Sequence, residues 1–179
     1  ALLSAAASHM PMTANVLAGA IAKQYPEKFS GDPESGASAL RSGLTALLQE
    51  HVYLAGIATG TALGGGDNAT QVAALDANSV ALSKAITSVY GDEAGTQFLA
   101  LWRKHIGFFV DYTVGKATKD DAKVEKARTD LEGYSSDFGA FIDSATEGAL
   151  PKAAVVANLS EHVKTLFAAI DAQAAGSPD

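Results

Sequence analysis

Residues 72–89 read VAALDANSVALSKAITSV, and this stretch decides the fold. Its apolar and small side chains recur at steps of three and four, which places them on one face of an α-helix. That face consists of Val72, Leu75, Ser79, Leu82, Ile86 and Val89. The pattern returns in residues 128–145, where Leu131, Phe138 and Ile142 replace Leu75, Leu82 and Ile86 at a constant shift. The two stretches therefore predict a duplicated helical hairpin.

The rest of the chain shows the same helical spacing. Residues 40–58, 98–112 and 155–170 each carry an apolar stripe, and breaks fall at Gly64-Gly65-Gly66, Gly91 and Pro151. Short connections make consecutive helices antiparallel. We therefore expect an all-α, up-and-down helical bundle of about five helices, built from a duplicated helical hairpin, over residues 38–174.

The ends of the chain are expected to lie outside this bundle. A short N-terminal helix and a linker rich in Pro, Gly and Ser are predicted over residues 14–37, and tails over 1–13 and 175–179. The first tail contains Ser8-His9-Met10. It is either the end of a secretory signal, whose cleavage site favours small residues, or a remnant of cloning.

The composition excludes several classes of function. The chain has 179 residues, no Cys and a formal net charge of -7. The absence of Cys excludes disulfides, thiolate metal sites and a Cys nucleophile. The negative charge argues against binding to a nucleic-acid backbone. No stretch is apolar for long enough to span a membrane, and no nucleophile–base pair of an enzyme is recognisable.

Three of the four histidines occupy equivalent places in the sequence. His51, His105 and His162 each lie on the apolar stripe of an odd-numbered helix of the expected bundle. Helices that run in the same direction would bring the three imidazoles to a similar height. Neutral imidazole is a ligand for zinc, copper and haem iron. The alternative is that each imidazole is a core side chain with its own hydrogen-bond partner.

Two sets of residues accompany this candidate site. Trp102, Phe109 and Tyr112 would line a pocket beside the histidines, with copper or haem as the candidate group. A weaker alternative is His9, Met10 and Met12, since imidazole and thioether ligands suit copper(I).

Charge is unusually sparse in one part of the chain. Residues 38–91 carry only Arg41, Glu50, Asp67, Asp76 and Lys84 as charged side chains. Helices with so few charges must cover their outer faces with small or neutral residues. We therefore expect residues 38–91 to pack against a second copy or an envelope partner; the alternative is a neutral, Ala-rich surface in contact with water.

Two sequence blocks carry a resemblance to a known family. They are residues 88–95, SVYGDEAG, and residues 101–112, LWRKHIGFFVDY. The chain resembles uncharacterised secreted or surface helical proteins of bacteria that are often labelled copper amine oxidase N-terminal-domain-like. The resemblance implies an extracytoplasmic helical domain and does not imply oxidase chemistry.

Two functional hypotheses follow from these observations. The first is an extracytoplasmic, non-enzymatic helical bundle that binds a metal ion or haem through its core-facing histidines. The second is a structural or self-assembling protein of the cell envelope whose histidines are core residues.

Overall fold

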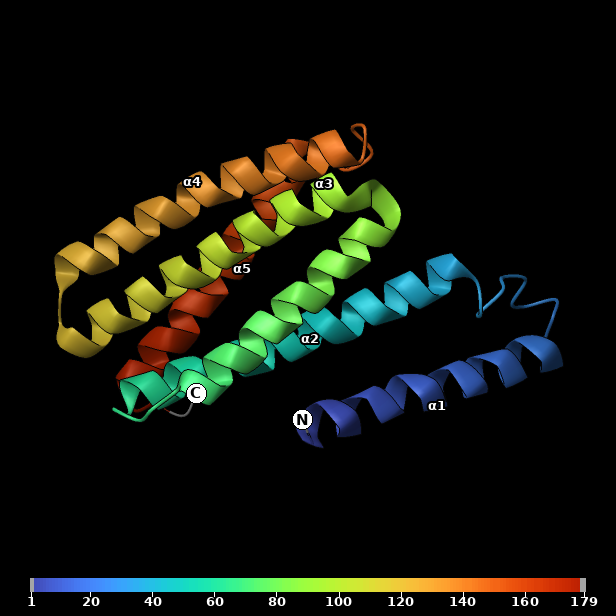
Figure 1. The fold of residues 1–179 in the computed structure, drawn as a ribbon, viewed down its shortest axis with the longest axis horizontal. Helices are drawn as coiled ribbons and strands as arrows, with labels where there is room; N and C mark the ends of the chain where they lie inside the picture. Colours follow the sequence, from blue (N-terminus) through green and yellow to red (C-terminus); the bar gives the residue numbers. More distant parts are fainter. Residues whose placement is uncertain (1, 178–179) are drawn as a thin grey trace. The chain divides into compact units, whose positions relative to one another are not determined.

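Five helices and no strand are found in residues 2–177, which the computed structural model describes (Figure 1). Side chains are described from residue 9 to residue 177. The helices are α1 (Leu2–Gln24), α2 (Gly36–Leu63), α3 (Ala69–Thr118), α4 (Asp121–Ala145) and α5 (Lys152–Ala174). Helix α3 packs on α4, and α4 packs on α5. The prediction of an all-α, up-and-down bundle is confirmed.

The chain divides into two compact units at Glu50 and His51, within helix α2. The first unit contains α1, the connection after it and the first part of α2. The second contains the rest of α2 together with α3, α4 and α5. All the site residues discussed below, apart from His9, Met10 and Met12, belong to the second unit.

Helix α1 is longer than expected. It begins at Leu2, so residues predicted to form a tail over 1–13 are helical from Leu2 onward. Ala and Leu dominate its first turns, and both have high helix propensity. Pro11 lies inside the helix, where it removes one backbone hydrogen bond.

Helix α3 bends sharply at Gly91, where the sequence predicted a break between two helices. Gly91 has φ 85° and ψ 173°, a conformation that is essentially restricted to glycine. The two halves diverge from this point in Figure 1. Arg103 in the second half holds Asp76 in the first through two hydrogen bonds of 2.7 and 2.9 Å. The non-helical backbone of Gly91 separates the two halves, so the predicted break between two helices is confirmed.

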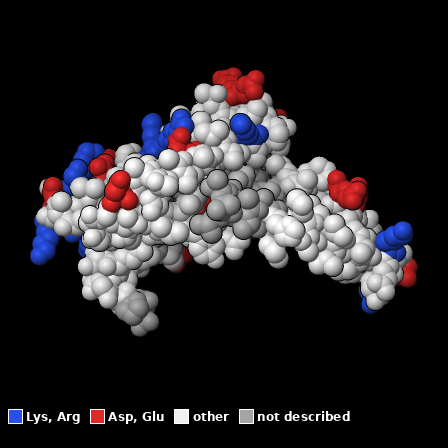
Figure 2. All heavy atoms as spheres, turned by 60° about the horizontal axis from the view of Figure 1, so that its bottom comes forward, with Lys and Arg blue, Asp and Glu red and all other residues white. Residues whose placement is uncertain are grey.

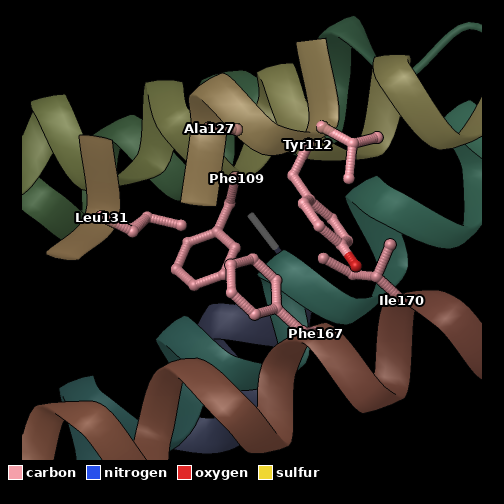
Figure 3. Close-up of a cluster of buried hydrophobic side chains, with 7 residues drawn as sticks. Phe109, Tyr112, Ala127, Leu131, Phe167 and Ile170 are labelled. Atoms are coloured by element: carbon pink, nitrogen blue, oxygen red, sulfur yellow. The ribbon is translucent and has the colours of Figure 1, made fainter. Parts of the chain in front are cut away.

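The main hydrophobic core lies between the second half of α3, α4 and α5 (Figure 3). The buried residues of this core are Phe109, Tyr112, Val124, Ala127, Leu131, Phe167 and Ile170. Several of them come from the stripes found in the sequence, which accordingly face inward. No helix in the described part of the chain has the length and apolar character that a membrane crossing requires.

Candidate functional site

A mainly apolar cavity of about 230 Å³ lies between α2, α3 and α5 in the second unit. Most of its wall is aliphatic or aromatic, and the polar lining side chains carry no formal charge. The lining residues are His51, Ala55, Ala58, Thr59, Ala62, Asn68, Val72, Leu75, His105, Ile106, Phe109, Val110, Thr113, Val114 and Leu166. An apolar wall with a few polar groups is typical of a small-molecule site.

Two of the predicted histidines meet at the wall of this cavity. The ring centroids of His51, from α2, and His105, from α3, are 5.5 Å apart. Only 5% of His51 and 4% of His105 is exposed. Both rings also contact Trp102, whose centroid is 5.0 Å from His51 and 4.5 Å from His105.

Burial keeps both imidazoles neutral at physiological pH. It lowers the pKa of His51 to about 4, with a further lowering from His162 and an opposing effect of a hydrogen bond with Asn78. It lowers the pKa of His105 to about 3, again with contributions from the other two histidines. The carbonyl of Trp102 opposes this shift without reversing it. Neutral imidazole has one nitrogen that donates a hydrogen bond and one that accepts.

Several polar atoms around the two imidazoles are buried without a hydrogen-bond partner among the described residues. They include Nδ1 of His51, Nδ1 of His105, Nε1 of Trp102 and the hydroxyl oxygen of Tyr134. Buried polar atoms in native proteins are nearly always hydrogen-bonded, so each such group needs a physical account. His51 and His105 therefore combine a place in the cavity wall with a buried nitrogen that has no partner among the described residues.

Hydrogen bonds connect the helices around the rest of the cavity. Gln173 of α5 donates to the carbonyl of Gly56 and accepts from the hydroxyl of Thr59, at 3.2 and 3.0 Å. Asn68 donates to the carbonyl of Ala58 at 3.3 Å. Asn68 and Gln173 are not among the site residues predicted from the sequence, because single amides outside the apolar stripes carry no recognisable signal.

The third histidine lies farther from the cavity. His162 on α5 is half-buried, and its ring centroid is 6.5 Å from that of Phe109. Burial lowers its pKa. Phe109 lines the cavity, but His162 does not. Two of the three predicted imidazoles therefore share the cavity wall, and the third contacts it through Phe109.

The predicted aromatic lining residues divide between different environments. Phe109 lies at the cavity as expected, whereas Trp102 packs against the two imidazoles without lining the cavity. Tyr112 is fully buried in the core between α3, α4 and α5. Its hydroxyl donates to Asp171 at 2.9 Å and accepts from Arg128 at 2.8 Å. Burial, followed by the bond to Asp171, raises the pKa of Tyr112 to about 12.

The weaker set of metal ligands lies in the first unit. His9, Met10 and Met12 are exposed on α1. Met10 and Met12 are two residues apart, and such residues point to different sides of a helix. A copper(I) site formed by these three residues stays a prediction.

The described residues also provide no complete metal site. Among them, no group of three or more His, Asp or Glu side chains is arranged so that it could hold a metal ion. Comparison with known proteins adds no relative: no protein-family model matches the chain, and neither a curated protein nor a solved structure matches it.

Proposed function

We propose that this protein is a binding module whose cavity between α2, α3 and α5 takes a small, uncharged and mainly apolar molecule. The observation that carries the proposal is the cavity itself, with neutral His51 and His105 in its wall. A 150 Å³ apolar cavity can bind benzene. The volume of about 230 Å³ therefore suits a molecule of one ring or a short branched chain.

Haem and a metal ion fit this cavity less well. Pockets for drug-sized ligands have volumes of roughly 300–1,000 Å³, and haem is a large ligand, so the proposal is for a smaller one. A metal ion bound by His51 and His105 is a second candidate, favoured by their unpartnered Nδ1 atoms. Two imidazoles alone are fewer protein ligands than zinc has at catalytic sites. Titration of His105→Ala against the wild type with Zn²⁺ and Cu²⁺ would test this candidate, and equal binding would contradict it.

A cavity-filling variant tests the main proposal. Toluene is the probe, and the measured quantity is the melting temperature Tm. At ten times its Kd, toluene should raise the Tm by roughly 3–6 °C, as expected for about 1.4 kcal/mol of linkage in a chain of this size. Ala58→Leu places a larger side chain in the cavity and should abolish the rise.

The matched control is Ala77→Leu, an exposed position of α3 that does not line the cavity. It should respond to toluene as the wild type does. Absence of a Tm rise in the wild type, or an equal rise in Ala58→Leu, would overturn the proposal.

Self-association is a second function that a separate observation favours. Val52, Tyr53 and Ile57 of α2 are each at least half exposed, and the space beside Gly56 is open. Much of the face in Figure 2 is uncharged, with Lys, Arg, Asp and Glu in small separate groups. The exposed apolar side chains of Val52, Tyr53 and Ile57, which lie within residues 38–91, suit contact with a second copy.

Sedimentation velocity over a range of concentrations tests this second function. Tyr53→Lys should shift an oligomer towards monomer, whereas Leu150→Lys, at an exposed apolar residue outside 38–91, should not. A wild type that remains monomeric at all concentrations would contradict it. An extracytoplasmic location, which the family resemblance implies, is part of the proposal and is consistent with a chain that has no Cys.

A further inference from the structure

We infer that the ligand of the cavity carries a hydroxyl group, as in a phenol or a small alcohol, which binds between the imidazoles of His51 and His105. This inference rests on the proposed function and specifies the chemical class of the ligand. It depends on three features of the site: the absence of charge, the paired imidazoles and the apolar remainder of the wall.

The absence of charge excludes ionic ligands. No Lys, Arg, Asp or Glu lines the cavity. A buried charge without a partner is costly, so neither a carboxylate nor an ammonium group would be compensated there. The two imidazoles are neutral because burial disfavours their protonated form. The polar group of the ligand must therefore be uncharged.

The paired imidazoles favour a group that both donates and accepts hydrogen bonds. Each neutral ring offers one N–H donor and one nitrogen lone pair. A hydroxyl can donate to one ring and accept from the other, whereas a ketone or an ether can only accept. His51 and His105 both line the cavity, and Nδ1 of each is buried without a hydrogen-bond partner among the described residues. The short distance of 5.5 Å between the ring centroids allows one small group to reach both rings.

The remaining wall determines the shape of the rest of the ligand. Ala58, Leu75 and Phe109 bury their side chains here and offer only apolar contact. An aromatic ring or a branched alkyl chain would fill this volume. Phenols combine such a body with one hydroxyl, which makes para-cresol a suitable probe.

The test compares probes of nearly equal shape by isothermal titration at pH 7.5. Toluene, para-cresol and 4-methylbenzoate share a methyl-substituted ring and differ in the group opposite the methyl. We expect para-cresol to bind about tenfold more tightly than toluene, which corresponds to about 1.4 kcal/mol for the hydroxyl. We expect 4-methylbenzoate to bind at least tenfold more weakly than para-cresol.

Variants then assign the preference to the imidazoles. His51→Phe and His105→Phe keep a ring at the wall but remove the nitrogens, so each should reduce the preference for para-cresol over toluene. The control His162→Phe changes an imidazole that does not line the cavity and should retain the full preference. Thermal melts without ligand establish that each variant is folded.

The outcomes separate this inference from the proposed function. If toluene binds and para-cresol binds no more tightly, the hydroxyl inference is wrong and the apolar cavity remains. The same holds if 4-methylbenzoate binds best, or if both His→Phe variants keep the preference. If none of the probes binds to the wild type, the proposed function itself fails.

Discussion

The imidazole of His105 stacks on the phenol ring of Tyr134, with ring centroids 5.1 Å apart and an interplanar angle of 27°. This contact joins the cavity wall on α3 to helix α4. The contact is unusual because it includes a buried polar group: the Tyr134 hydroxyl has no hydrogen-bond partner among the described residues. Burial raises the pKa of Tyr134 far above its usual value, so the phenol is neutral.

Removal of the Tyr134 hydroxyl should cost little stability. Because the oxygen makes no hydrogen bond, Tyr134→Phe should leave the free energy of unfolding within about 0.5 kcal/mol of the wild type or raise it by up to about 1 kcal/mol. The stacked ring on His105 is kept. Urea unfolding at pH 7.5 measures the difference.

Tyr112→Phe is the matched control for this variant. Its hydroxyl bonds to Asp171 and Arg128 in the core, and its loss should reduce the free energy of unfolding by about 1–3 kcal/mol. Comparable losses in the two variants would show that Tyr134 does have a partner in solution.

Stability should fall as the pH decreases from 6.5 towards 4. Burial lowers the pKa of His51 to about 4 and that of His105 to about 3, whereas both have values near 6.5 when unfolded. In this window the unfolded chain binds more protons, so the free energy of unfolding decreases as the pH falls. Together, the two residues should lower the free energy of unfolding by on the order of 3–4 kcal/mol between pH 8 and pH 5.

Urea unfolding at pH 8, 6 and 5 checks this slope. The double variant His51→Phe/His105→Phe should have a much flatter dependence over the same range. A wild type as stable at pH 5 as at pH 8 would mean that the two imidazoles are accessible to protons in the folded state. Asp171 does not account for the effect. Burial alone would raise its pKa, but the hydrogen bonds from Lys116 and Tyr112 lower it, so its contribution to stability is lost only at lower pH.

The helices could be predicted from the sequence because their limits depend on local chemistry. Glycines end α2 after Leu63 and bend α3 at Gly91, and Pro151 precedes α5. Glycine widens the range of backbone conformations and proline narrows it, whatever packs around them. Helix α1 was underestimated because its first turns are rich in Ala and Leu, which have high helix propensity, but carry no apolar stripe in the sequence.

The site could be predicted only in part, because it depends on how distant helices cross. The stripe of α3 that carries His105 also carries Phe109 and Tyr112. In the folded chain this stripe divides, since α3 contacts α4 and α5 as well as the end of α2. Phe109 reaches the cavity, whereas Tyr112 turns into the core. Sequence spacing shows that residues share a face, but it does not show which neighbour each one meets.

The kink of α3 should depend on the missing side chain of Gly91. Its φ of 85° and ψ of 173° are strained for any L-residue with a Cβ atom, so Gly91→Ala should lower the free energy of unfolding by about 1–3 kcal/mol. Gly107→Ala, in the second half of the same helix, is the control. Gly107 has open space around it, and alanine should stabilise the helix there by roughly 0.5–1 kcal/mol. Equal effects of the two substitutions would show that α3 can be straight at Gly91.

The crossing of α4 and α5 should depend on Gly139. A Cβ atom at Gly139 would lie 2.8 Å from Cγ2 of Val156 and 3.2 Å from the carbonyl oxygen of Lys152, so the helices would have to separate. Overpacking of this kind costs about 1–3 kcal/mol, and we expect Gly139→Ala to lower the free energy of unfolding by an amount in that range. Gly133→Ala, on an exposed and open position of α4, should instead be stabilising. Urea unfolding compares the two, and a stabilising effect at both positions would mean that α4 and α5 pack less closely than the structure indicates. Because α5 also supplies Leu166 to the cavity wall, Gly139→Ala should weaken toluene binding if the displacement of α5 reaches the cavity.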